Sequence, residues 1–442
     1  MEKATSKKTL VPSGNLWPFI LITSLFFLWG LANNMTDTLL AAFKRIMSMT
    51  DFQTSWIQVA FYGSYFCLAL PAAIFIKKYT YKSGTLLGLG MFVLGALLFY
   101  PASITMAYGH FLVALFILAG GLSILETAAN PYIYAMGPEA SGTRRLNLAQ
   151  SFNPIGSIMG VFLSKMFILS HLNMATAEER ALMTPAELTT IQSEELLAVM
   201  GPYVGVAIFL VVLWVIIYVT KMPEASDART NIDLKPTVKR LVKNSNYVWG
   251  VLAQFFYVGA QLCIWSFTIR YVMQELNVNE DSASTYYMAA LILFAISRFI
   301  FTSLMKFIKP RTLLLICSIA AALCTLMVIY GSGYVSIYAL VAVSGFMSLM
   351  FPTIYGIAIR GLGSDTKIGG SGLIMAVVGG AVFPAIQGQI SDMTQSISLA
   401  FYVPFMCFLV IVLYSIFGGK KYADPSEVAD NEAFTPGKLQ EV

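Results

Sequence analysis

The amino-acid sequence predicts an all-α integral membrane protein with twelve spanning helices in two six-helix bundles. Of the 442 residues, 57% are hydrophobic and only 12% are charged, so the chain lacks the polar surface that a large soluble protein needs. Twelve apolar segments are each long enough to cross a bilayer, which takes about 20 residues. A charged stretch separates the first six segments from the last six.

The first bundle comprises the spans that precede this charged stretch. The segment after Lys7 and Lys8 is too long and too polar for a signal peptide, so we expect it to remain as a helix. Between the fifth and sixth spans, residues 171–199 predict a short amphipathic helix or a loop on the outer side. The six spans are 17–42, 54–76, 83–103, 109–136, 146–170 and 200–220.

The second bundle follows a middle segment, 221–246, that is charged and contains Pro223 and Pro236. Its six spans are 247–273, 283–305, 311–330, 334–358, 368–391 and 397–418. A division into six and six spans indicates two halves related by an axis along the membrane normal. We therefore expect a first domain over 1–220, a cytoplasmic linker over 221–246, a second domain over 247–418 and a polar cytoplasmic tail over 419–442.

The distribution of basic residues predicts the orientation of the chain. With the N-terminus in the cytoplasm, few of the 28 lysines and arginines lie at or beyond the outer ends of helices: Lys44, Arg45, Lys165, Arg180 and Arg270. The others lie on or near the cytoplasmic side, as the positive-inside rule requires. We therefore expect both termini in the cytoplasm.

Composition and motifs also exclude several classes of function. The net charge of +5 is spread over short loops, so no nucleic-acid surface is expected. The five cysteines fall within predicted spans without a CxxC pair, which argues against disulfides and thiolate metal sites. His110 and His171 sit at outer span ends and no nucleophile elbow occurs, so we expect neither an enzyme nor a bound metal or cofactor.

Two acids, Asp37 and Glu126, lie inside the predicted spans, and one arginine, Arg298, lies well within a helix. Such a residue costs at least about 2.5–3.5 kcal/mol on insertion, so it usually faces a protein interior or a water-filled path. Arg298 lies towards the inner end of its span, where snorkelling to the headgroups is an alternative. The two acids are too short to snorkel far, and a carboxylate in a partly dry cavity is a candidate proton acceptor near neutral pH.

Polar neighbours recur at helical spacing around these residues. Asn33 and Asn34 lie four and three residues before Asp37, with Trp29 and Gly30 one turn earlier. Asn130 lies four residues after Glu126. The remaining polar positions are Gln150 and Asn153 on span 5, the stripe Gln254, Tyr257, Gln261 and Trp265 on span 7, Tyr286 and Tyr287 on span 8, and Tyr355 on span 10.

This set of side chains suits a neutral polyol. Planar amides and carboxylates bind paired hydroxyl groups, and aromatic faces cover the apolar face of a sugar ring. A phosphate or carboxylate substrate would need several basic side chains, and only Arg298 is present. Two alternatives remain open: acids with aromatic residues also suit an exported cation, and amides in membrane helices often only bond neighbouring helices.

Several strings within these spans resemble the L-fucose/proton symporter family of the major facilitator superfamily, and the likeness runs from span 1 to span 12. They are Trp29-Gly-Leu-Ala-Asn-Asn-Met-Thr-Asp37, Leu125-Glu-Thr-Ala-Ala-Asn-Pro131, Arg145-Leu-Asn-Leu-Ala-Gln-Ser-Phe-Asn153, Tyr257-Val-Gly-Ala-Gln261 with Trp265-Ser-Phe-Thr-Ile-Arg270, and Phe351-Pro-Thr-Ile-Tyr355. The resemblance implies the major facilitator fold, alternating access and proton-coupled sugar import.

Carried over to matching positions, the resemblance implies a role for each polar residue. Asp37 becomes the proton-coupling carboxylate and Glu126 a second acid needed for sugar binding. The implied sugar pocket also contains Trp29, Asn34, Gln150 and Asn153 from the first half and Gln261, Trp265, Arg298 and Tyr355 from the second. One departure from the wider superfamily is the loop Ile76-Lys-Lys-Tyr-Thr-Tyr-Lys82, which lacks the usual acidic and Arg-Gly-containing motif.

We therefore expect a monomeric, multi-pass L-fucose/proton symporter of a bacterial inner membrane, with the sugar and the bilayer as its partners and the proton as its co-transported ion. A glucose, galactose or other hexose transporter, or a sodium-coupled one, is an alternative. A sugar sensor without transport is a further alternative, but such sensors generally carry an added soluble signalling domain, and neither the tail nor the 221–245 loop is large enough to be one.

Overall fold

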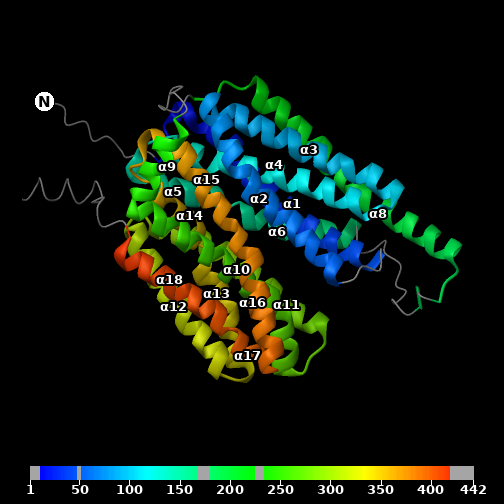
Figure 1. Cartoon of the computed structure of the whole chain (residues 1–442). Helices are drawn as coiled ribbons and strands as arrows, with labels where there is room; N and C mark the ends of the chain where they lie inside the picture. The colour runs from blue at the N-terminus through cyan, green and yellow to red at the C-terminus, as the bar shows by residue number, and fades with distance from the viewer. Residues whose placement is uncertain (1–9, 47–50, 168–178, 181, 224–232, 419–442) are drawn as a thin grey trace, which may run out of the picture.

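The computed structural model describes residues 10–46, 51–167, 179–180, 182–223 and 233–418, and its secondary structure there is helical throughout (Figure 1). The first half contains α1 (Leu16–Ile46), α2 (Asp51–Lys78), α3 (Tyr81–Thr105), α4 (Tyr108–Ala135), α5 (Gly142–Gln150), α6 (Asn153–Phe167) and α8 (Pro185–Val219). The second half contains α10 (Ser245–Leu276), α11 (Glu280–Leu304), α12 (Pro310–Tyr330), α13 (Gly333–Met347), α14 (Met350–Ala358), α15 (Thr366–Met375), α16 (Gly379–Thr394), α17 (Ile397–Ala400) and α18 (Tyr402–Phe417).

Eleven helical segments of the described residues are long and apolar enough to cross a membrane. The predicted fifth span, 146–170, is covered by α5 and α6, which are separated at Ser151 and Phe152. The helix is interrupted there because Pro154 has no N–H to donate to the carbonyl of Gln150. A second interruption, between α13 and α14, precedes Pro352 in the same way.

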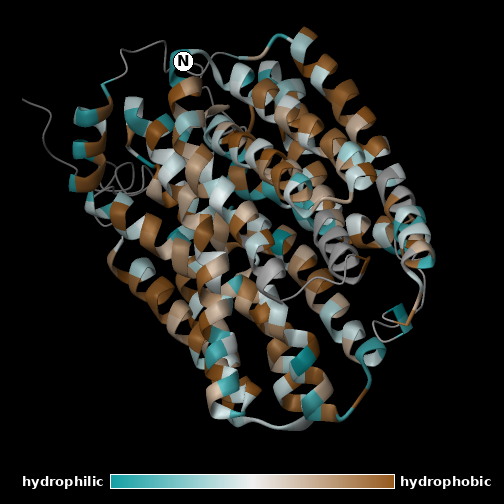
Figure 2. Cartoon of the chain, turned by 45° about the vertical axis from the view of Figure 1, so that its right-hand side comes forward, coloured by the Kyte–Doolittle hydropathy of each residue, from teal (hydrophilic) through white to brown (hydrophobic). Residues whose placement is uncertain are grey.

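Large apolar side chains cover the outside of the helices. Phe209 on α8 and Leu323 on α12, for example, are more than half exposed. Figure 2 shows hydrophobic residues along the helices and hydrophilic residues gathered towards helix ends and loops. This distribution is typical of a membrane protein, in which the outer surface of the spanning helices faces lipid.

The outer segment between the fifth and sixth spans differs from the prediction. The sequence predicts a short amphipathic helix or a loop over 171–199, of which 171–178 and 181 lie outside the described residues. From Pro185 onward the chain forms one continuous helix with span 6. A capping box between Thr184 and Glu187 begins this helix, which explains why it starts well before the apolar run. Arg180 and Glu195 form a buried ion pair at 2.6 Å that ties the preceding residues to α8.

Part of the predicted linker is helical. The short helix α9 (Leu234–Lys243) lies before α10, and Arg240 on its last turn contacts Asp365 in the 3-10 helix η4 (Gly363–Asp365) at 2.7 Å. These hydrogen bonds to the carboxylate raise the pKa of the Arg240 guanidinium. The contact attaches α9 to the second half of the chain.

The helices enclose two apolar cores, one formed mainly by α1–α6 and α8 and one by α10–α18. Side chains from the second half, including Tyr355, Ile368 and Leu373, belong to the first core. They come from α14 and α15, which pack against α2, α4 and α5. We call the end of the molecule that carries Leu10 and Phe417 the terminal end, and the two halves are joined there. Towards the opposite end the helices of the two halves diverge, as Figure 1 shows.

Within the first half, α1 and α6 pack with their backbones in contact. A Cβ atom at Gly156 would lie 1.8 Å from the carbonyl oxygen of Phe27, and one at Gly30 would lie 2.0 Å from that of Asn153. Small residues allow this approach, as in the small-xxx-small interfaces of membrane helices. Gly160 continues the contact one turn later, against Leu31.

Replacing Gly156 with alanine is therefore expected to lower stability. The methyl group would displace the Phe27 backbone, and overpacking of this kind costs about 1–3 kcal/mol. Thermal unfolding of the purified protein in detergent measures the loss as a lower Tm. Gly205→Ala on α8 is the matched control, because a Cβ atom there meets nothing within 4 Å. Equal melting temperatures for the two variants would contradict the predicted close contact.

Candidate functional site

Glu126 lies on α4 in the interior of the chain and is only 4% exposed. The hydroxyl of Tyr65 on α2 donates a hydrogen bond to its Oε1 atom at 3.1 Å. Its Oε2 atom is buried and has no partner among the described residues. A buried carboxylate oxygen without a donor is costly, so this atom is a candidate to receive a proton or a ligand hydroxyl group.

A chain of amides leads from Glu126 to the second half. Asn130, one turn further along α4, donates to the backbone oxygen of Glu126 at 3.1 Å and accepts from Gln150 Nε2 at 2.7 Å. The carbonyl oxygen of Gln150 in turn accepts from Arg298 Nη1 on α11 at 2.9 Å. Residues from both halves thus form one buried polar network.

Arg298 points into the protein, so the snorkelling alternative does not apply. It is 4% exposed, its Nε atom donates to the carbonyl of Ser348 at 2.5 Å, and its guanidinium lies 4.6 Å from the ring centroid of Phe294. Trp265 on α10 meets the same ring edge-to-face, with centroids 5.1 Å apart. Trp265 is half-buried and its indole donates to Ser344 at 3.4 Å.

On the first half, Trp29 and Asn153 lie across the α1–α6 contact. Trp29 stacks on Phe26, and Asn153 donates to the backbone oxygen of Phe26 at 3.2 Å. The buried Trp29 indole N–H makes no hydrogen bond of standard geometry to a described residue, and it interacts with the Tyr65 hydroxyl. A donor of this kind on a half-buried aromatic side chain is suited to a hydroxyl-bearing ligand.

For two predicted site residues, Asn34 and Asp37, the structure describes no hydrogen bond to the polar network around Glu126. Asn34 donates to the backbone oxygen of Gly30 at 3.2 Å. Asp37 belongs to α1, but its side chain falls within the stretch 36–45, outside the side chains that the structure describes. Its role in proton coupling therefore stays a prediction.

The predicted polar stripe on α10 is divided by its environment. Gln254 and Tyr257 are completely buried, and the Tyr257 hydroxyl donates to the carbonyl of Met347 at 3.1 Å within the second half. Gln261 and Trp265, further along the helix, are only half-buried. The Gln261 amide makes no hydrogen bond to a described residue, which leaves it available to a ligand.

Tyr355 on α14 is completely buried on the terminal side of this network. Its hydroxyl has no partner among the described residues and lies against Gly370, where a Cβ atom would approach it to 2.6 Å and Pro131 on the other half to 3.7 Å. This packing places Tyr355 in the contact between the halves. It is therefore a part of the closed end in this structure.

Tyr65, Phe294 and Ser348 did not emerge from the sequence as site residues. Tyr65 lies in Phe61-Tyr-Gly-Ser-Tyr65, where a tyrosine, a glycine and a serine precede it within one helical turn of an apolar span. That local polarity is the signal that could have identified it. Phe294 and Ser348 carry no such signal, because an apolar ring and a backbone carbonyl are common to every span.

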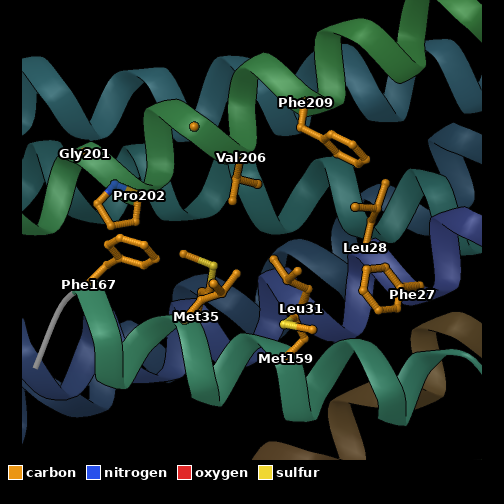
Figure 3. Close-up of a pocket in the computed structure, with 12 residues that line it drawn as sticks. Phe27, Leu28, Leu31, Met35, Met159, Phe167, Gly201, Pro202, Val206 and Phe209 are labelled. Atoms are coloured by element: carbon orange, nitrogen blue, oxygen red, sulfur yellow. The ribbon is translucent and has the colours of Figure 1, made fainter.

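A separate cavity of about 700 Å³ lies between α1, α6 and α8 (Figure 3). Its lining is apolar: Phe27, Leu28, Leu31, Met35, Met159, Leu163, Phe167, Gly201, Pro202, Gly205, Val206 and Phe209. Such a surface offers no side-chain hydrogen bond to a polyol. The polar network around Glu126 is therefore the candidate site, and this cavity is not.

The chain is similar to known proteins over nearly its whole length. Residues 22–384 match the family model of the Major Facilitator Superfamily. An L-fucose-proton symporter of Haemophilus influenzae is 40% identical over 423 residues, covering 93% of this chain and 97% of that protein. A glucose/galactose transporter of Brucella abortus is 31% identical over 404 residues, covering 90% and 93%.

Solved structures show the same likeness in three dimensions. A crystal structure of a major facilitator transporter, FucP, in the outward conformation matches with a TM-score of 0.86 and 38% identity, covering 91% of this chain and 99% of that one. A proton:xylose symporter structure, 11% identical, matches with a TM-score of 0.63 over 90% of this chain and 95% of the other, which supports the fold alone.

Proposed function

The chain belongs to the L-fucose–proton symporter family of the Major Facilitator Superfamily, and on this basis we propose that it imports L-fucose with a proton by alternating access. It is a multi-pass membrane transporter and not an enzyme. Its general activity is proton-coupled sugar symport. The proposal adds the identity of the sugar, the roles of the site residues and an inner-membrane orientation with cytoplasmic termini.

One observation carries the assignment of the sugar site: a buried acid, two amides and an arginine from both halves form a continuous network. Glu126 Oε2 is an acceptor without a partner among the described residues, and the Trp29 indole N–H is a donor that makes no hydrogen bond of standard geometry there. A pyranose hydroxyl can both donate to the first and accept from the second. Because the network spans the two halves, a sugar bound there would be sensitive to their relative position.

In the proposed cycle, the terminal end corresponds to the cytoplasmic side and is closed in this structure. A proton binds Asp37 from the outside, and the sugar binds near Glu126. Neutralising a charge lowers the cost of enclosing it, so only the loaded or the empty carrier changes conformation. The outward conformation of the similar FucP structure is consistent with this arrangement.

The experiment is uptake of labelled L-fucose into liposomes that contain the purified protein. An inward proton gradient is expected to drive accumulation, and a protonophore is expected to abolish it. Unlabelled glucose and galactose test the second candidate function, which the 31% identical glucose/galactose transporter favours. Accumulation of glucose but not fucose would overturn the assigned sugar, and accumulation driven only by a sodium gradient would overturn the assigned ion.

The Tyr65 hydroxyl is expected to position the Glu126 carboxylate for the sugar. In Tyr65→Phe, the carboxylate loses its only described hydrogen-bond donor, and a hydrogen bond to a charged group is worth about 1.5–3 kcal/mol. The Kd for L-fucose, measured by isothermal titration calorimetry, should therefore rise at least about tenfold. Tyr132→Phe is the matched control, since its hydroxyl bonds the Pro223 carbonyl instead. Equal affinities in the two variants would contradict this role.

A further inference from the structure

The two interruptions of the spanning helices face the same side chain. At the first, Pro154 cannot donate to the Gln150 carbonyl four residues earlier, and at the second, Pro352 cannot donate to the Ser348 carbonyl. A buried carbonyl without a donor is costly, so each needs a partner from elsewhere. Arg298 supplies both: Nη1 donates to Gln150 O at 2.9 Å and Nε to Ser348 O at 2.5 Å.

These two acceptors lie on opposite halves. Ser348 follows α13 on the same half as Arg298, whereas Gln150 ends α5 on the other half. The bond to Ser348, together with the Phe294 ring 4.6 Å away, fixes the plane of the guanidinium. The remaining edge is thereby directed across the interface to Gln150. The planar fork of arginine suits this task, because it presents several N–H groups in fixed directions.

Neighbouring contacts show that this bond is part of the closed end. Asn147 donates to Thr353 across the interface at 3.1 Å, and a Cβ atom on Gly356 would approach the Thr143 hydroxyl to 2.6 Å. Separation of α5 from α14 would break the Asn147–Thr353 hydrogen bond and the contact between Thr143 and Gly356. It would also leave the Gln150 carbonyl without its donor in the protein interior.

We propose that Arg298 is a latch that holds the terminal end closed by donating to two proline-freed carbonyls, one on each half. Pro352 leaves the Ser348 carbonyl free to hold Arg298 on its own half, and Pro154 leaves the Gln150 carbonyl free as the acceptor on the other half. Opening of this end requires that Arg298 release the Gln150 carbonyl. The side chain of the same residue donates to Asn130, one turn from Glu126. Movement of the Asn130–Gln150 pair by a ligand at Glu126 would therefore act on the latch directly. The inference deepens the proposed function and rests on its alternating access.

The latch can be tested without any sugar, by the distance between two spin labels at the terminal end. Ala140 and Ser364 are exposed there, one on each half, and would carry the labels as cysteines in the full chain with its five native cysteines replaced. In the parent protein, a single short distance is expected. In Arg298→Ala, the ratio of closed to open molecules should fall at least about tenfold, as for the loss of one bond from a charged donor.

Three further variants distinguish the latch from a general loss of packing between the halves. Arg298→Lys keeps the charge but not the fork, so it should behave like Arg298→Ala. Pro154→Ala gives Gln150 a donor within its own helix, so it should also open the terminal end while strengthening the fold locally. Pro101→Ala on α3 removes an exposed helix proline away from the interface and should leave the distances unchanged.

The outcomes are decisive in either direction. Opening in Arg298→Lys and Pro154→Ala, with no change in Pro101→Ala, supports the latch. Distances in Arg298→Lys or in Pro154→Ala that match the parent protein overturn it, and because Pro154→Ala restores a helical hydrogen bond, misfolding cannot account for that result. Since the labels report conformation only, failure of L-fucose uptake in liposomes would count against the proposed sugar and not against the latch.

Discussion

Replacing Asp37 with asparagine is expected to abolish uphill L-fucose import while leaving exchange intact. The amide keeps the size of the side chain but cannot bind or release the coupling proton, so the carrier behaves as though permanently protonated. Loaded with sugar, such a carrier still changes conformation, because no charge has to be enclosed. In liposomes with an inward proton gradient, internal fucose should rise only to the external concentration.

Two measurements make this prediction specific to coupling. Counterflow of labelled against unlabelled fucose should proceed in Asp37→Asn at a rate similar to that of the parent protein, and it should be insensitive to pH. Asn33→Asp on the same helix is a useful comparison, since it adds a carboxylate one turn away without removing Asp37. Gradient-driven accumulation in Asp37→Asn would show that another group carries the proton.

Replacing Glu126 with alanine is expected to abolish measurable L-fucose binding. The carboxylate offers two acceptor positions, and hydrogen bonds to a charged group contribute about 1.5–3 kcal/mol each. Loss of both predicts a Kd at least about 100-fold higher by calorimetry. Glu126→Gln, which keeps Oε1 as an acceptor for Tyr65 but replaces the unpartnered oxygen with a donor, should lie between alanine and the parent protein.

Gln254→Leu provides the control for this loss. Its amide is completely buried and neither of its polar atoms has a partner among the described residues, so no hydrogen bond there joins it to the network. Removing an unsatisfied buried amide should preserve fucose affinity and raise the melting temperature. A loss of affinity in Gln254→Leu comparable to that in Glu126→Ala would indicate that both act through folding.

Much of the fold was predictable because lipid imposes simple requirements. A spanning helix needs about 20 apolar residues, and the composition of the spans met that requirement clearly. What failed was the outer end of span 6, where the helix begins at Pro185 because a capping box, a local hydrogen-bond arrangement, extends it beyond the apolar run. The helix α9 was also missed, since its attachment depends on Asp365, more than a hundred residues away in the sequence.

The candidate site was predictable where a charged or polar side chain inside a span is energetically costly and therefore conspicuous in the sequence. Glu126 and Arg298 stood out as charges inside spans, and Gln150 stood out as an amide at helical spacing from Asn153. The structure places Glu126, Gln150 and Arg298 in one network. Tyr355 is buried in the contact between the halves, Tyr257 lies in the second core, and Gln254 is completely buried. Periodicity gives the face of a helix but not the neighbour that covers it, so these placements required the tertiary structure.

The backbone contact between α1 and α6 has a mechanical consequence for the carrier. Gly30, Gly156 and Gly160 leave no compressible side-chain layer between the two helices, so strain applied to one is passed to the other with little loss. Trp29 and Asn153 sit on this stiff pair. We therefore expect α1 and α6 to move as one rigid body when a sugar binds between the halves. Sugar binding would then rotate both helices along their whole length instead of rearranging only the side chains near the sugar.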